Sequence, residues 1–275
     1  MADSIQLNHV KEWSVLRGFT NLLHKESRAW WGTRRWWINA ILWPILLCGL
    51  MANMLFVPAI ANLASEAEIS QAGSLTAYVI QMGLSVFFEF GMIALGIGAI
   101  ILLQDSIIGE KQSGTAEWLL SKPVVPRAYV LAKFVGNTLA VLSLLLGGPI
   151  IIAYSMLSIR LGELFPARPF LLAAGIMTVH TLFYLALTLM LGTIFSTRGP
   201  VLGIGLASIL GGNLLGGLFK PLFYVTPWIL PKTASLSASG LSLPPEMGII
   251  PLTTTFIWIP IFILLAIIKF ENIEL

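Results

Sequence analysis

The chain has 275 residues, of which 57% are hydrophobic and only 11% are charged, and its formal net charge is +3. Soluble globular domains carry about 25% charged residues, so this composition excludes an ordinary soluble domain and indicates an integral membrane protein. The only cysteine, Cys48, excludes an intrachain disulfide and a cysteine-based metal cluster, and the mild net charge does not indicate a nucleic-acid partner.

The first predicted element is an N-terminal amphipathic helix within 9–35. Apolar side chains fall on one side of a helical wheel: Trp13, Leu16, Phe19, Leu23, Trp30 and Trp31. Polar side chains fall on the other side: Arg17, Asn21, His24, Lys25 and Arg28. This pattern predicts a helix that lies in the membrane interface. Such a helix either only orients the first span or also binds a soluble partner through Arg17, His24 and Arg28.

Six apolar segments follow that are long enough to cross a hydrocarbon core of about 30 Å. They are 37–59, 77–103, 127–157, 170–195, 200–219 and 249–268. With this assignment, 12 of the 16 Lys and Arg residues fall on one side of the membrane. Because an excess of Lys and Arg marks the cytoplasmic side, we expect both termini in the cytoplasm of a multi-pass cell-membrane protein. The proline-broken outer segment 220–248 is then a candidate re-entrant element.

Glu89 and His180 lie deep inside the predicted spans. Glu89 falls about 22 Å from the cytoplasmic boundary at 1.5 Å per residue, where such groups face a bundle interior or a wet cavity. It is either a structural residue bonded to a neighbouring helix or part of a substrate path or proton step. His180 has no second ligand at metal spacing, which favours a satisfied packing residue over a metal site.

Catalytic motifs are missing from the sequence. It contains no GxxxxGK[ST], HExxH or GxSxG pattern, so we do not expect an enzyme, a bound metal or a bound cofactor. If ATP drives this protein, then a different chain must bind the ATP and its Mg²⁺.

The connection between the second and third predicted spans gathers an unusual share of the charge, in "GEKQSGTAEWLLSKPVVPRAYVLAK" at 109–133. Its centre, 115–122, predicts a short helix that Pro123 ends. Gly109 and Gly114 are expected to turn the backbone before it. We expect four charged residues to face the cytoplasm: Glu110, Lys111, Glu117 and Lys122. The connection is either an ordinary charged linker or a rigid handle for a cytoplasmic partner.

This connection resembles that of the ABC-2 type transporter permeases. The matching positions are Glu110, Gly114, Thr115, Leu119, Leu120, Ser121, Pro123, Val124, Arg127 and Lys133. The six-span plan extends the resemblance over most of the chain, whereas Val125–Pro126 and Ala132 depart from the commoner pattern. The chain also looks like the permease of the copper-handling system that matures nitrous oxide reductase.

The resemblance implies an all-α polytopic membrane protein with a single transmembrane domain over 1–275. In it, 9–35 would be the connecting helix, 104–126 the coupling element and 220–248 the outer segment. The implied function is the permease subunit of an ABC exporter, paired with two copies of a separate ATPase and a second permease copy, identical or related. The coupling residues would be Glu110, Gly114, Thr115, Glu117, Trp118, Leu119, Leu120, Pro123 and Arg127.

Two alternatives remain at this point. One is a carrier or channel that needs no ATP and uses Glu89 for ion coupling, although a single deep charge and the lack of an inverted repeat argue against it. The other is a membrane anchor that holds a cytoplasmic complex without transporting anything. The sequence does not indicate a substrate.

Overall fold

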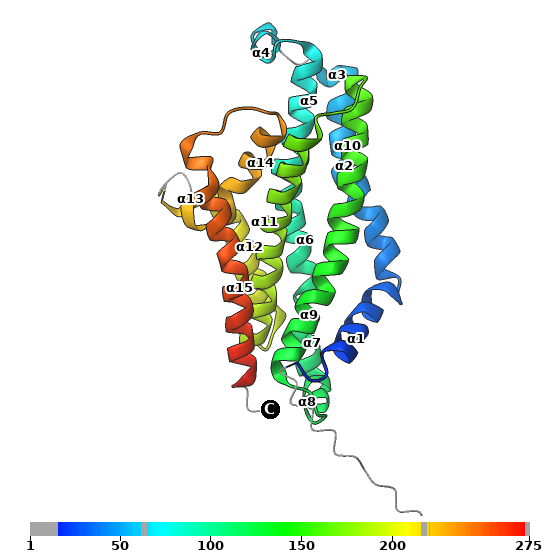
Figure 1. Cartoon of the computed structure of the whole chain (residues 1–275), viewed down its shortest axis with the longest axis vertical. Helices are drawn as coiled ribbons and strands as arrows, with labels where there is room; N and C mark the ends of the chain where they lie inside the picture. Colours follow the sequence, from blue (N-terminus) through cyan, green and yellow to red (C-terminus); the bar gives the residue numbers. More distant parts are fainter. Residues whose placement is uncertain (1–15, 62–64, 216–218, 220, 273–275) are drawn as a thin grey trace, which may run out of the picture.

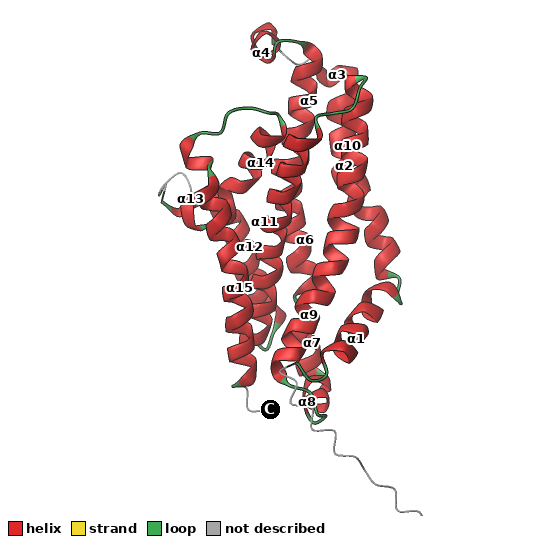
Figure 2. Ribbon diagram, viewed as in Figure 1, coloured by secondary structure: helices red, strands yellow, loops and turns green. Residues whose placement is uncertain are grey.

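The computed structural model describes residues 16–61, 65–215, 219 and 221–272. Every regular element in these ranges is a helix, and Figure 2 shows that short loops join them. The helices form an elongated bundle, with α8 at one end and α3 and α4 at the other (Figure 1). We refer to these as the α8 end and the α4 end.

The chain enters the bundle at the α8 end through α1 (Phe19–Trp31) and α2 (Arg35–Phe56). One side of α2 is apolar yet exposed, including Ile41, Leu42 and Ile45. An exposed apolar stripe of this kind suits contact with lipid. The short helices α3 (Pro58–Ala61) and α4 (Glu66–Ala72) lie at the far end.

The second long helix returns to the α8 end without a break. It joins α5 (Leu75–Ser85), the π-helical turn η1 (Val86–Phe90), α6 (Gly91–Leu103) and α7 (Asp105–Gln112) into one helix of 38 residues. A left-handed Gly114, with φ of 69°, then turns the chain into α8 (Thr115–Leu120). The expected turn at Gly109 is wrong, because that glycine lies inside α7.

The third and fourth long helices complete the centre of the bundle. The third joins α9 (Pro126–Ala140), the π-helical η2 (Val141–Gly147) and α10 (Gly148–Leu161), and it begins at Pro126, as the fixed φ of proline at a first helical position favours. The fourth, α11 (Ala167–Ile194), has the largest buried share of the long helices and packs against α6, α14 and α15.

The remaining elements are shorter until the last helix. They are α12 (Arg198–Leu215), α13 (Leu222–Val225), η3 (Pro227–Ile229), α14 (Leu230–Ala238), η4 (Pro245–Met247) and α15 (Ile249–Glu271). Within the predicted outer segment, α14 is buried on one side and packs against α5, η1 and α11. It is therefore part of the bundle and not a surface loop.

Five helices of the described chain are long and apolar enough to cross a membrane. They are Arg35–Phe56, Leu75–Gln112, Pro126–Leu161, Ala167–Ile194 and Ile249–Glu271. The all-α polytopic membrane fold is thus confirmed. The predicted span at 200–219 corresponds to α12, which runs from near the α8 end towards α13 in Figure 1. It is not among the five, so a sixth span stays a prediction.

Candidate functional site

A cluster of charged side chains joins three helices near the α8 end. We define this junction cluster as Lys25 and Glu26 of α1, Glu110 of α7, and Tyr129 and Lys133 of α9. Lys133 Nζ lies 3.0 Å from Glu26 Oε1 and 3.0 Å from Glu110 Oε1. Lys25 also pairs with Glu110, and the Tyr129 hydroxyl donates a hydrogen bond of 2.6 Å to Glu110 Oε2.

The junction cluster is largely shielded from solvent. The side chain of Lys133 is 2% exposed and that of Glu110 is 19% exposed. Charges in such surroundings attract strongly, but each depends on its partner because a lone buried charge is costly. With two ammonium and two carboxylate groups the cluster is balanced, so it fastens α1, α7 and α9 to one another.

Close packing between α1 and α9 supports this junction. A Cβ atom at Gly136 would lie 2.7 Å from Cβ of Glu26, so only glycine lets the two helices approach this closely. One turn further along, Trp30 Nε1 donates a hydrogen bond of 2.8 Å to Asn137 Oδ1. The helix α1 is therefore fixed along α9, and its place in the membrane interface stays a prediction.

The face of α1 that packs inward agrees in part with the predicted one, because Phe19, Leu23 and Trp30 pack against the core. Its buried residues are Leu22, Glu26 and Trp30, while Leu16 and Trp31 are exposed. The sequence pattern failed here because Glu26 is buried by pairing with Lys133 rather than by apolar contact. Trp13 lies outside the described residues.

The predicted partner-facing residues of the connecting helix are accessible. The side chains of Arg17, His24 and Arg28 are exposed. The backbone carbonyl of Arg17 accepts a hydrogen bond of 3.2 Å from the amide of Val125, which joins the start of the connecting helix to the segment before α9. Their predicted role in partner binding stays a prediction.

The opposite side of α7 is fastened to the turn between α11 and α12. Lys111 Nζ donates hydrogen bonds to the backbone carbonyls of Gly192, Thr193 and Phe195, at 3.1, 2.8 and 3.2 Å. A lysine placed on the free carbonyls of a helix end stabilises that end. Arg198 at the start of α12 pairs with Asp105 at 2.8 Å. Thus α7 contacts α1, α9, α11 and α12 through charged side chains.

These contacts correct two expectations about the coupling element. Glu110 and Lys111 do not face outward, because both are occupied by partners on neighbouring helices. Glu117 and Lys122 are exposed, as expected. The sequence did not show that Glu110 and Lys111 would be engaged while Glu117 and Lys122 stay exposed, since a cytoplasmic connection normally exposes all its charged side chains.

The exposed part of the coupling element is α8. We define the α8 surface as Glu117, Trp118, Ser121 and Lys122, which are all exposed. The side chain of Trp118 is 60% exposed, and Lys122 Nζ lies 4.9 Å from its ring centre. Large exposed aromatics of this kind are typical of binding surfaces.

The other predicted coupling residues position this surface. Leu119 and Leu120 pack against the hydrophobic core, and Pro123 is exposed just after the helix. Thr115 Oγ1 shares a hydrogen bond of 2.8 Å with Ser113 Oγ beside the Gly114 turn. Arg127 pairs with Glu271 at 2.7 Å, which places the last turn of α15 at the α8 end.

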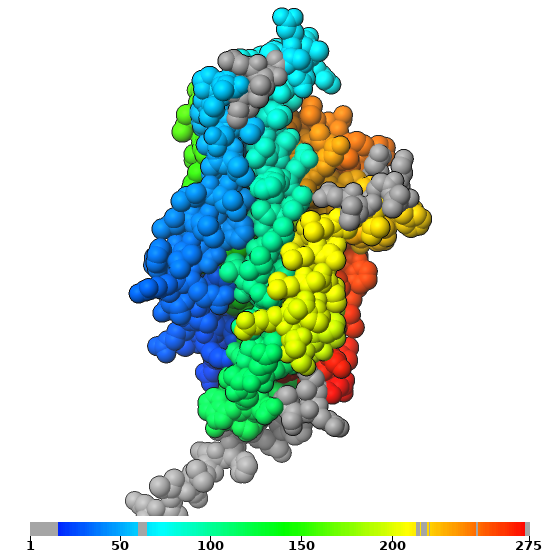
Figure 3. All heavy atoms as spheres, turned by 180° about the vertical axis from the view of Figure 1, so that it is seen from behind, coloured from blue at the N-terminus to red at the C-terminus, as the bar shows by residue number. Residues whose placement is uncertain are grey.

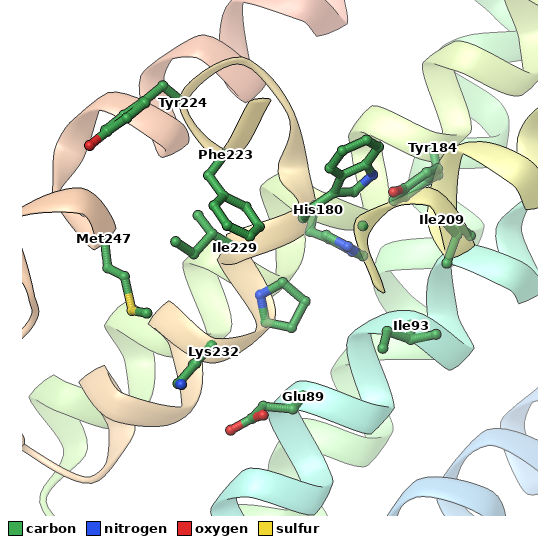
Figure 4. Close-up of a pocket in the computed structure, with 13 residues that line it drawn as sticks. Glu89, Ile93, His180, Tyr184, Ile209, Phe223, Tyr224, Ile229, Lys232 and Met247 are labelled. Atoms are coloured by element: carbon green, nitrogen blue, oxygen red, sulfur yellow. The ribbon is translucent and has the colours of Figure 1, made fainter. Parts of the chain in front are cut away.

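A cavity of about 600 Å³ lies nearer the α4 end, where α6, α11 and α12 meet the segment from α13 to η4 (Figure 4). Its lining includes Glu89, His180, Tyr184, Trp228 and Lys232. Figure 4 shows Glu89 of η1 and Lys232 of α14 approaching it from two sides. Pockets of this volume that combine apolar walls with a few polar groups are typical ligand sites.

His180 differs from the expected satisfied packing residue. It is 2% exposed, and its Nδ1 has no hydrogen-bond partner among the described residues. In the same residues, no group of three His, Cys, Asp or Glu side chains could hold a metal ion. A buried polar atom without a partner is unusual and calls for an explanation.

Several site residues were not predicted. Glu26, Tyr129 and Lys232 had no distinguishing local pattern, whereas Lys133 stood in the motif that carried the family resemblance. Lys133 at the head of an apolar helix was the available signal, because a buried lysine requires an acidic partner. Which acid it would meet depends on how α1 and α7 pack.

A family model described as ABC-2 family transporter protein matches residues 20–275. A comparison with curated proteins gave no match. Because the family match covers nearly the whole chain, this multi-pass membrane protein belongs to the ABC-2 family of transporter proteins and is an ABC-type permease.

Proposed function

We propose that the chain is the membrane subunit of an ABC exporter and that a separate ATPase chain binds at its α8 surface. The observation that carries this proposal is the attachment of α8. It presents an exposed Trp118 and Glu117, and it follows directly after α7, which charged contacts join to four other helices. A force applied at α8 would therefore reach several spans together.

The same force would reach the cavity along one helix. From Glu110 to Glu89 the chain is helical throughout, a distance of about 31 Å at 1.5 Å per residue. Glu89 lies in the π-helical turn η1, and such turns are frequent at functional sites and are local weak points of a helix. We infer that movement of α7 changes the shape of the cavity at η1.

In this proposal the α8 end is cytoplasmic, with both chain termini, and the protein lies in the cell membrane. Two ATPase copies bind ATP and Mg²⁺ and act on two permease copies, identical or related. The excess of Lys and Arg near α8 supports that orientation. The narrower resemblance to a copper-system permease stays a prediction.

A tagged purification tests the proposal. The full chain would be isolated from native membranes in mild detergent, and its partners identified and assayed for ATP hydrolysis. We expect a stoichiometric P-loop ATPase. A chain that purifies without one and moves solute in vesicles without ATP would overturn the proposal.

A carrier that uses Glu89 is the second candidate, because Glu89 faces the cavity and has no ion-pair partner among the described residues. In that case Glu89→Gln would abolish ion-dependent uptake into vesicles that contain no ATP. In the exporter, ATP would be required whether or not Glu89 is changed.

A further inference from the structure

We propose that the cavity at Glu89 and an adjoining apolar groove form one site for an amphipathic molecule whose head group carries both an ammonium and a phosphate. This inference rests on the proposed function, since it names the substrate class of that exporter. The site has a polar end in the cavity and an apolar end in the groove.

The polar end has two ionisable groups of opposite sign. Glu89 and Lys232 line the same cavity from η1 and α14, but no hydrogen bond or ion pair joins them or engages either with another described residue. Glu89 lies within a spanning helix, where ionisable groups normally pair with one another or serve a ligand. Lys232 is an exposed residue of α14. A zwitterionic head group fits both, with its ammonium at Glu89 and its phosphate at Lys232.

Further side chains complete the polar end. The imidazole of His180 borders the cavity in Figure 4, and its buried Nδ1 lacks a partner among the described residues. Because this nitrogen is itself buried, a hydrogen bond to the head group requires the imidazole to turn towards the cavity. Tyr184 and Trp228 add aromatic surface at the same cavity, which favours contact with an ammonium group.

The apolar end is a groove of about 360 Å³ between α2 and α6. Apolar residues line it between Phe90 and Leu102 on one side and at Leu42 and Leu46 on the other. Its polar member, Asn39, is already engaged, because its amide donates to the Arg35 carbonyl and accepts from Trp43 Nε1. The groove therefore suits a hydrocarbon tail and offers nothing to a head group.

The two halves adjoin each other at Ile93. Ile93 lines both the cavity and the groove, and Phe90 in the groove is next to Glu89 in the chain. In Figure 3, α2 and α6 lie side by side along one face of the molecule. From Phe90 to Leu102 the groove follows α6 for about 18 Å, close to half of a hydrocarbon core of about 30 Å.

The positions of the cavity and the groove along α6 set the orientation of the ligand. The tail spans about one leaflet and points towards α7, while the head group points away from the α8 end. An amphiphile held in this way has the orientation of a lipid in the leaflet opposite α8. That is the orientation in which an exporter releases it.

Equilibrium binding to the purified full chain in detergent tests the inference, with no ATP or ATPase present. The probes are three single-chain amphiphiles with equal tails: lysophosphatidylethanolamine, lysophosphatidylglycerol, which lacks the ammonium, and an alkylamine, which lacks the phosphate. We expect the first to bind at least tenfold more tightly than the other two. Similar affinities for all three would overturn the proposal, even if every variant failed to fold.

Variants then locate each part of the ligand. Glu89→Gln should abolish the preference over lysophosphatidylglycerol, and Lys232→Gln the preference over the alkylamine. The controls Glu66→Gln and Arg168→Gln change exposed charges elsewhere and should leave both preferences intact. Wild-type preferences in a folded Glu89→Gln or Lys232→Gln chain would refute the polar half of the site.

A bulky residue in the groove tests the apolar half. Ala94→Phe should weaken lysophosphatidylethanolamine binding at least tenfold, whereas Ala207→Phe, on the exposed part of α12, should not. Unchanged binding in Ala94→Phe would refute the groove. The binding result and the exporter proposal can fail separately. If no ATPase binds the chain, the amphiphile can still bind. If the site does not select among the three amphiphiles, an ATPase can still co-purify with the chain.

Discussion

At the scale of single residues, Lys133 best shows how charge holds this membrane protein together. Its ammonium group lies between Glu26 and Glu110 with almost no exposure. Replacing all members of a buried ion pair by neutral groups often costs little stability. Removing only one partner is costly, because the remaining buried charge has no compensating charge.

We therefore expect Lys133→Met to lower the free energy of unfolding by about 3–5 kcal/mol, as for other broken buried pairs. A denaturant titration in mixed micelles measures it. The matched control is Arg198→Gln, which breaks an exposed pair with Asp105 and should cost about 0–1 kcal/mol. Equal effects of the two variants would show that the junction cluster does not depend on Lys133.

A combined variant tests the cause. Adding Glu26→Gln and Glu110→Gln to Lys133→Met removes the uncompensated carboxylates, so stability should partly return. If the triple variant is less stable than Lys133→Met alone, then lost packing and not unpaired charge explains the effect.

The residue scale also shows what the sequence could not predict. The motif around Glu110 could be recognised in the sequence, but the side to which its carboxylate points could not. An acidic residue in a polar connection has the same sequence context whether its side chain faces solvent or a neighbouring helix. The pairing of Glu110 with Lys25 and Lys133 depends on sequence separations of 85 and 23 residues. No local pattern carries that information.

At the scale of elements, the connecting helix and α9 form one unit. The approach of α1 to α9 requires glycine at position 136, where any side chain would collide with Glu26. Helix propensity alone would favour another residue at this position.

Gly136→Val should consequently destabilise the protein by about 1–3 kcal/mol through overpacking, in spite of the better helix propensity of valine. The control is Gly175→Val in α11, where an added Cβ meets nothing within 4 Å. That change should be close to neutral in the same unfolding titration. A stable Gly136→Val protein would mean that α1 moves away from α9 at little cost.

Hydrophobic length identified most elements correctly. The spans predicted at 37–59, 127–157 and 170–195 correspond to long helices within a few residues. The second span runs nine residues beyond its predicted end at 103, because α7 continues α6 although it is polar. Its polar side chains are satisfied by partners from other helices, which hydropathy does not consider.

At the scale of the whole molecule, the number of membrane crossings decides which ends share a side. If α12 crosses, α8 and the end of α15 lie on one side and α4 on the other. If it does not, the end of α15 lies with α4. The pairing of Arg127 with Glu271 supports the first arrangement.

Cysteine labelling measures this directly. In a Cys48→Ala background, single cysteines replace Ser121 in α8, Ala67 in α4 and Asn272 after α15, all of them exposed. An impermeant maleimide should label only Ala67→Cys in intact cells, and the other two only in inside-out vesicles. Labelling of Asn272→Cys from the outside would refute six crossings.

We propose that ATP-driven force enters this permease through the α8 surface. The most direct measurement is the amount and activity of the ATPase that co-purifies with Glu117→Arg/Trp118→Asp, compared with wild type. A matched control, Glu163→Arg/Leu164→Asp, alters another exposed acidic and apolar pair, at the other end of the bundle. The account predicts an ATPase loss of at least tenfold in the α8 variant only, with unchanged thermal stability. Wild-type recovery of active ATPase by the α8 variant would contradict it.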